Sequence, residues 1–255
     1  TAAAFLLAHW ESTISYTLND GSVSVPNGGL RLGWDGNGTF TQNGGTVAVK
    51  GLRANRDGHS GRGTYNLNAG TLTLGANGID FGSTGSLVLG GGKIVATETA
   101  TMTLDAGLAM ATVTEIEVAS DKALTLNAVL SGERDLVKTG AGTLIISKVP
   151  NGYTGAIRVN AGALDAQGSR DLQNIVFAEG TKLIAHETTA DDGVIYITGI
   201  TGDPTLALYD ALGNRINLGL TASSATAGCG AVTPIRVISS TTICFLTATA
   251  SAARS

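Results

Sequence analysis

The residues of this 255-residue chain best suited to acid–base or metal chemistry are four regularly spaced aspartates. Asp35, Asp57, Asp80 and Asp105 follow one another at intervals of 22, 23 and 25 residues. If they stack on successive coils of a repeat, they predict a carboxylate column that needs a cation such as calcium to offset its repulsion. The stronger interpretation is that they stand in turns, because "WDGNG" and "RDGHS" are turn-like sequences.

The other candidates for catalysis or ligand binding are scattered. His9, His59 and His186 lack metal-ligand spacing. The glycine-rich stretch "LVLGGGKIVA" lacks the Ser or Thr and the spacing of a phosphate-binding loop. We therefore expect no catalytic residue, no metal site and no cofactor, and we predict that the protein is not an enzyme.

One basic stretch, "KGLRANRDGHSGR", differs from its acidic surroundings. It carries Lys50, Arg53, Arg56 and Arg62 around a single Asp57. Because it falls between two clear repeats, we expect it to project as a loop that binds an acidic partner surface or an anionic glycan. The alternative is a solvated loop that keeps the protein soluble, and the sequence leaves both open.

The composition indicates many short strands separated by tight turns. Glycine contributes 36 residues, about twice its usual share, whereas only 14% of residues are charged and four are proline. The net charge of −4 argues against nucleic-acid binding by bulk electrostatics. No apolar run approaches the roughly 20 residues of a membrane span. We therefore expect an all-β protein with no nucleic-acid partner and no membrane span.

Two phrases of the sequence are nearly identical: "GTFTQNGGTVAV" at 38–49 and "GTYNLNAGTLTL" at 63–74. Their plan, a strand, a turn of Asn with Gly or Ala, and another strand, recurs more loosely elsewhere. The turn asparagines are Asn27, Asn43, Asn68, Asn127 and Asn160. Apolar residues stand three positions before such turns, at Phe40, Tyr65, Leu87, Met102, Leu124 and Ile157.

Many similar turns, mostly about 15 to 25 residues apart, favour stacked coils over isolated hairpins. We predict a right-handed parallel β-solenoid in which the turn asparagines form a ladder and the apolar residues form the core. A set of ordinary antiparallel sandwiches is the competing architecture.

The stretch "DLVKTGAGTLIISKVPNGYTGAIRVNAGAL" at 135–164 resembles the autotransporter-associated β-strand repeat of bacterial surface proteins. The matching residues are Lys138, Gly140, Gly142, Thr143, Leu144, Tyr153, Gly155, Val159, Gly162 and Leu164. The resemblance implies a parallel β-helix displayed outside the cell, and it implies no catalytic residues. We expect no outer-membrane barrel after this stretch, so the resemblance does not imply self-export.

The repeat pattern divides the chain into three expected parts. Residues 1–18 form an N-terminal arm or cap, residues 19–185 the solenoid, and residues 186–255 a small antiparallel β-sandwich or β-rich cap. Cys229 and Cys244 in the last part either form a disulfide or include a buried strand thiol at Cys244.

The expected function is structural, with many copies displayed on an extracellular assembly. A bacteriophage virion component, a fibre or a capsid decoration, is the first interpretation. The alternatives are a secreted bacterial surface or filament protein with an adhesin role, and a polysaccharide-degrading β-helix enzyme. The expected partners are copies of the protein itself, other virion or cell-surface proteins, and surface glycans.

Overall fold

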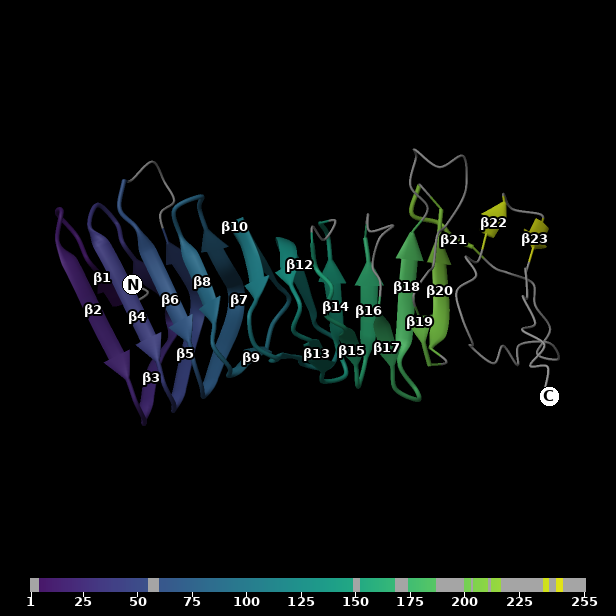
Figure 1. The fold of residues 1–255 in the computed structure, drawn as a ribbon, viewed down its shortest axis with the longest axis horizontal. Coiled ribbons are helices and arrows are strands. Elements are labelled where there is room, and N and C mark those ends of the chain that lie inside the picture. Colours follow the sequence, from purple (N-terminus) through teal and green to yellow (C-terminus); the bar gives the residue numbers. More distant parts are fainter. Residues whose placement is uncertain are drawn as a thin grey trace, which may run out of the picture.

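The structure, a computed structural model, describes residues 5–54, 60–148, 152–167, 174–186, 200–202, 204–210, 212–216, 236–238 and 242–244. Every regular element in these residues is a β-strand. The strands stack into an elongated rod, with the first strands at one end and the last at the other (Figure 1). The described residues contain no helix long and apolar enough to cross a membrane. The predicted all-β fold with a parallel β-solenoid is confirmed.

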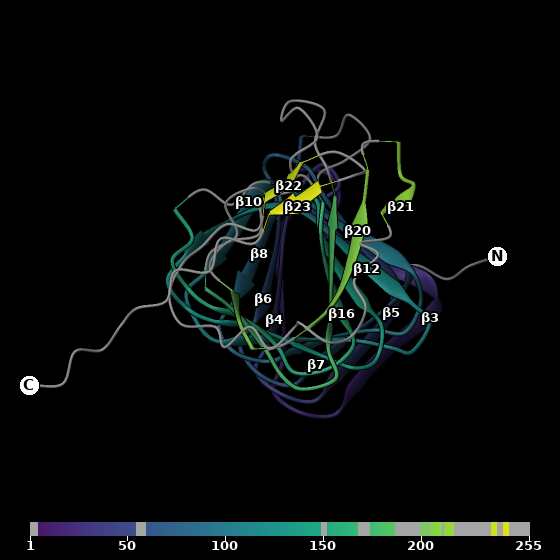
Figure 2. The same cartoon turned by 90° about the vertical axis from the view of Figure 1, so that its right-hand side faces the viewer.

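The first part of the rod has three faces, which enclose the core in the view along its axis (Figure 2). The first face is a parallel sheet of β2 (Thr13–Leu18), β4 (Asn37–Gln42), β6 (Gly63–Leu67) and β8 (Ser86–Leu89). The end of β10 (Ala100–Met110) continues beside β8, and the end of β12 (Ala123–Gly132) pairs with β10.

The second and third faces belong to one 17-stranded sheet, because long strands bend from one face to the other. The bent strands are β3 (Ser22–Leu32), β5 (Thr46–Ala54) and β7 (Thr71–Phe81). The second face continues with β9 (Lys93–Ala96), β11 (Thr114–Val118), β13 (Leu136–Thr139), β15 (Ile157–Val159), β17 (Ile175–Phe177) and β19 (Ile200–Thr201). The third face comprises β1 (Phe5–Leu7), the starts of β10 and β12, β14 (Thr143–Ile146), β16 (Ala163–Ala166), β18 (Lys182–His186) and β20 (Thr205–Tyr209).

The core is a set of columns that run along the rod axis. One column on the third face joins Leu124, Leu144, Leu164 and Leu183 in parallel register, and all four side chains are buried. The apolar residues expected in the core are also buried, which confirms that prediction for Phe40, Tyr65, Leu87, Met102, Leu124 and Ile157. Each coil therefore buries its apolar residues against those of its neighbours.

Glycines permit the corner that follows Asn43 and Asn68. Gly45 and Gly70 have φ angles of 66° and 83°, a region in which other residues are strained. A Cβ atom on Gly70 would also collide with the backbone carbonyl of Gly45 in the preceding coil. The "NGG" and "NAG" turns of the two repeated phrases are therefore required by the backbone.

The parallel stack extends beyond both boundaries expected for the solenoid, residues 19 and 185. At one end, β1 and β2 pair in parallel with β3 and β4. At the other end, β19 and β20 pair in parallel with β17 and β18. The parallel pairing continues at both ends although the turn sequences change, and a search for turns therefore stops too early.

Antiparallel pairing in the described residues is limited to two short pairs near the C-terminus. The first is β21 (Arg215–Ile216) against β20, and the second is β22 (Arg236–Ile238) against β23 (Thr242–Cys244). The β20–β21 pair covers part of the last parallel strand, as a cap would. Cys229 lies outside the described residues, so the two alternatives for the cysteines stay predictions.

Candidate functional site

The structure does not place the spaced aspartates in a column. Asp80 is in register with Thr103 of the following coil, and Asp105 stands two residues farther along β10. Asp35 lies in the corner after β3, and Asp57 is outside the described residues. The spacing misleads because the corners of successive coils differ in length. In the part of the chain that the structure describes, no group of three or more His, Cys, Asp or Glu side chains is placed to hold a metal ion.

The basic stretch is spread over β5 and the corner that follows it. Lys50 and Arg53 are exposed in β5, and Arg62 is exposed just before β6. The guanidinium of Arg53 lies 4.0 Å from the carboxylate of Asp80. Arg56 falls outside the described residues. Partner binding by these cations stays a prediction.

Asparagines form a ladder at the corner between the first and second faces. The Asn68 amide donates to the Asn43 side-chain oxygen at 2.9 Å, and the Asn43 amide donates to Asn19 at 2.9 Å. Asn19 was missed in the sequence because "NDG" differs from the two repeated phrases. Like side chains thus bond from coil to coil along this corner.

The other turn asparagines do not join this ladder. Asn27 and Asn160 lie at the corner between the second and third faces. Asn127 lies where β12 bends toward the first face, 3.5 Å from the Thr103 hydroxyl and 3.4 Å from that of Ser147. The five expected positions are therefore divided among three corners, because similar turn sequences serve each of them.

A buried glutamine fixes the same corner from the inside. Gln42 is fully buried, and its amide nitrogen donates to the carbonyls of Gly45 and Thr71, both at 3.1 Å. Its side-chain oxygen accepts a hydrogen bond of 2.7 Å from the Tyr65 hydroxyl. Burial raises the pKa of Tyr65, which keeps this hydroxyl a donor. All polar atoms of the Gln42 amide group are thus used to hold the corner.

A buried lysine has the corresponding role in the stretch that resembles the autotransporter repeat. Lys138 is fully buried, and its ammonium donates to the carbonyls of Thr139, Gly140 and Ala161 at 2.6, 2.7 and 3.1 Å. Burial lowers the pKa of Lys138 to about 8, and the Glu117 carboxylate opposes this shift. The lysine of the motif therefore binds two successive corners together rather than facing solvent.

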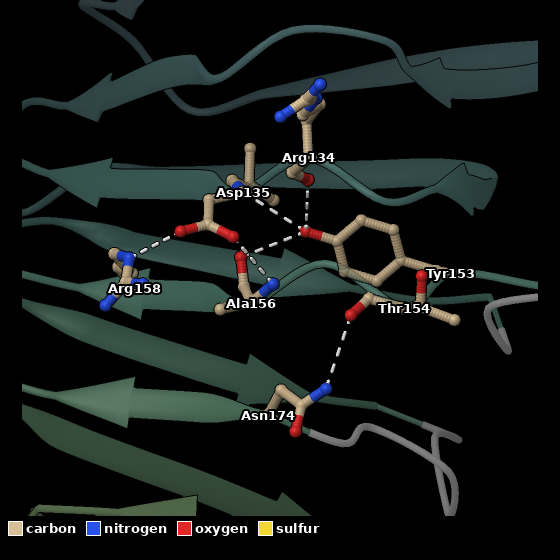
Figure 3. Close-up of polar contacts among 8 residues, drawn as sticks. Arg134, Asp135, Tyr153, Thr154, Ala156, Arg158 and Asn174 are labelled. Atoms are coloured by element: carbon tan, nitrogen blue, oxygen red, sulfur yellow. Dashed lines mark hydrogen bonds and ion pairs between the residues drawn. The ribbon is translucent and has the colours of Figure 1, made fainter.

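The motif tyrosine bonds to the backbone at the start of β13, the strand that carries Lys138, and its contacts are drawn in Figure 3. The Tyr153 hydroxyl lies 3.1 Å from the Arg134 carbonyl and 3.0 Å from the Ala156 carbonyl, and it accepts the Leu136 N–H at 3.2 Å. Burial raises the pKa of Tyr153 to about 12. This hydroxyl joins three backbone groups where the described residues place no strand on the first face.

An aspartate beside this tyrosine bonds to the next coil (Figure 3). Asp135 accepts the Ala156 N–H at 3.0 Å and the Arg158 guanidinium at 2.6 Å. These two contacts hold the pKa of Asp135 below its usual value, and the bond from the Ala156 backbone has the larger effect. One coil farther on, the Asn174 amide donates to the Thr154 carbonyl at 3.3 Å. The cluster is a set of structural bonds between neighbouring coils.

One acid–base pair lies near the last coils on the third face. The Asp165 carboxylate is 2.8 Å from Nε2 of His186, and the imidazole stacks on Tyr209 with centroids 5.3 Å apart. Burial raises the pKa of Asp165, and His186 opposes the shift. His186 stands alone in the sequence, because its partner Asp165 is 21 positions away.

The motif that carries Lys138 and Tyr153 lies in a stretch that matches a family model. Residues 136–166 match the family model of the passenger-associated transport repeat. The match covers β13 to β16 and confirms the resemblance found in the sequence. No curated protein and no solved structure matches the chain.

The transport repeat and the parallel solenoid together fit a passenger-like surface protein of bacteria. They suggest an extracellular or cell-surface location. They give no support to the interpretation as a bacteriophage virion component, and the bacterial alternative from the sequence fits better.

Proposed function

We propose that the chain is a non-catalytic, rigid part of a secreted bacterial surface protein with an adhesin role. The observation that carries the proposal is the transport repeat at 136–166, built into a parallel stack that runs from Phe5 to Tyr209. A stack in which each coil buries its neighbour makes a stiff rod that can hold a binding surface away from the cell.

The polar groups on the outside of the stack support a structural role. The Lys93 ammonium contacts the carboxylates of Glu115, at 2.9 Å, and Glu117, at 2.5 Å. The hydroxyl of Thr139, which belongs to the following coil, donates to the Glu115 carboxylate at 2.7 Å. Charged side chains thus pair along the rod axis, where they help to hold neighbouring coils in register.

Surface labelling of producing cells tests the location. An antibody raised against the purified rod should label intact cells, and external protease should remove the label while a periplasmic marker survives. Label that appears only after lysis, or that sediments with virus particles from the culture, would contradict the proposal.

The absence of catalysis needs its own test, because Asp165 and His186 are the pair that an enzyme would use. We expect no cleavage of a panel of acidic and neutral polysaccharides, with calcium present. Turnover that is lost in Asp165→Asn, while the melting temperature is retained, would support the alternative of a polysaccharide-degrading enzyme.

We also propose that copies of the chain associate through the first coil. Ile14 and Tyr16 of β2 are in register with the inward positions of β4, yet they are 43% and 37% exposed. A second copy that pairs with the edge of β2 would cover them. Sedimentation over a concentration series should show self-association that Tyr16→Lys weakens, and a monomer at every concentration would refute it.

A further inference from the structure

The corner between the third and first faces brings together three segments that are distant in sequence. The Trp34 N–H donates to the Ala8 carbonyl at 3.0 Å, and the Gly61 N–H donates to the Trp34 carbonyl at 3.2 Å. Farther along the same corner, the Arg62 N–H donates to the Asn37 side chain at 3.3 Å. The N-terminal segment, the turn after β3 and the end of the basic stretch therefore lie on consecutive coils.

This corner holds both tryptophans of the chain. The His9 ring lies between them, with its centroid 4.8 Å from that of Trp10 and 6.1 Å from that of Trp34. The guanidinium of Arg31 sits over Trp34, 3.9 Å from the ring centroid. We call Trp10, His9, Trp34 and Arg31 the aromatic corner.

Trp10 is displayed to solvent by a turn with a constrained backbone. Trp10 is 81% exposed, although a tryptophan usually buries most of its large ring. Ala8, Trp10 and Glu11 have φ angles of 63°, 54° and 55°, which cost energy in residues other than glycine. The Ser12 hydroxyl closes the turn with a 2.5 Å bond to the His9 carbonyl.

A buried polar atom beside Trp10 has no protein partner in the described residues. It is Nδ1 of His9. Such atoms are rare in folded proteins, because an unpaired buried polar group costs about 1–3 kcal/mol. Strained backbone and an unpaired polar atom within four residues of an exposed tryptophan are features that concentrate at binding sites.

The surroundings of the aromatic corner contain arginines together with the acidic residues Glu11 and Asp35, and Arg53 lies 4.0 Å from the carboxylate of Asp80. Arg31 is in register with Arg53 on the third face, and the exposed Arg62 lies on the next coil of the corner. A ligand that rests on the aromatic corner therefore meets a flat, exposed ring and the exposed guanidinium of Arg62, a group suited to carboxylates or sulfates.

We propose that the aromatic corner binds an acidic oligosaccharide. One sugar ring lies with its C–H face on the exposed ring of Trp10, and an acidic substituent meets the exposed Arg62. The inference deepens the proposed adhesin role by naming its ligand class. A protein or membrane partner fits less well, because Trp10 is the one large apolar side chain that the aromatic corner itself exposes, which is less than the apolar patches those partners use.

Tryptophan fluorescence of the purified full chain tests the proposal directly, because both tryptophans belong to the aromatic corner. The probes are acidic tetrasaccharides derived from polygalacturonate, alginate and heparin, with maltotetraose as the neutral control. At least one acidic probe should quench the emission, and maltotetraose should bind about tenfold more weakly or worse. The quenching should weaken as salt rises.

Variants assign the quenching to the corner. In Trp10→Ala we expect a loss of affinity of about tenfold or more, measured by calorimetry, with an unchanged melting temperature. The matched control is Val113→Ala, which shortens an exposed side chain elsewhere and should bind as wild type. No quenching by any acidic probe, equal binding of maltotetraose, or unchanged affinity in Trp10→Ala would each overturn the proposal. Because these assays use purified protein, failure here leaves the cell-surface location to its own test.

Discussion

The coils before and after Gly132 are built differently. Residues 13–132 have strands on all three faces, and their first corner is held by the asparagine ladder outside and by Gln42 inside. From residue 136 to 209, the described part of each coil has strands only on the second and third faces. In this second region Lys138 and Tyr153 hold the corners.

In both regions a buried polar side chain holds a corner, but its chemical type differs. Gln42 and Lys138 each stand at an inward position at the end of a strand, where they donate to corner carbonyls of their own and the following coil. Gln42 is neutral and uses two donors, whereas Lys138 is charged and uses three. The comparison indicates that buried side-chain bonds to the backbone hold corners in both regions, and that the charged Lys138 makes more of them.

The largest effects should come from the core, which the two regions share. Leu124 and Leu164 belong to one buried column, the first in the three-stranded region and the second in the other. Leu124→Ala and Leu164→Ala should each lower the free energy of unfolding by about 2–5 kcal/mol. Denaturant titration measures this, with Val113→Ala as the exposed control. A cost under about 1 kcal/mol at Leu124 would show that the assigned register is wrong.

Removal of the buried lysine should have the next largest effect. Lys138→Met keeps most of the apolar stem but leaves three carbonyls without their donor, so we expect a loss of about 3 kcal/mol. Gln42→Met deprives two carbonyls and the Tyr65 hydroxyl, and should cost about 2 kcal/mol. Equal or greater stability of Lys138→Met would mean that desolvation of the charge outweighs its bonds.

Because Lys138 can lose its charge and Gln42 has none, we expect the free energy of unfolding to depend on pH through Lys138. The pKa of Lys138 is lowered to about 8 in the folded state, so between pH 8 and 10 the unfolded chain binds more protons. The free energy of unfolding should therefore rise by about 2 kcal/mol over this range. Above pH 10 the raised pKa values of Tyr65 and Lys93 act in the opposite direction. The rise should vanish in Lys138→Met and persist in Gln42→Met.

The smallest effects should come from the outer bonds of each region. Tyr153→Phe removes one hydroxyl that contacts three backbone groups and should cost about 1 kcal/mol. Asn68→Ala removes one exposed rung of the ladder and should cost about 0.5 kcal/mol or less. Thermal unfolding of the two variants measures these costs. If Asn68→Ala is destabilised more than Tyr153→Phe, the asparagine ladder contributes more to stability than we expect.

The parallel stack and its core could be predicted from the sequence, because the alternation around Phe40 and Tyr65 is regular and the turns repeat. The single asparagine ladder could not, since Asn27 and Asn43 have similar neighbours but lie at different corners. Corner identity depends on the position of a turn within the coil, which its local sequence does not encode.

The buried polar residues can be recognised in the sequence from their positions within the strands, although not from the turn motifs. Gln42 stands two positions after Phe40, and Lys138 two positions after Leu136. Residues two positions apart in a strand face the same side, so both should point into the core. A polar residue at an inward position of a strand predicts a bond to the backbone. The aromatic corner left no such signal, because it depends on stacking between segments whose sequences differ.

Hydrogen exchange of wild type and Lys138→Met tests most directly whether Lys138 holds the successive corners of the second region. The backbone amides of Asn160 and Ala163 donate to the carbonyls of Lys138 and Gly142 across the corners that Lys138 holds. We predict that these two amides lose protection in the variant, while the amides of Asn43 and Asn68 keep theirs. Unchanged protection at Asn160 and Ala163, or an equal loss along the whole rod, would contradict the account.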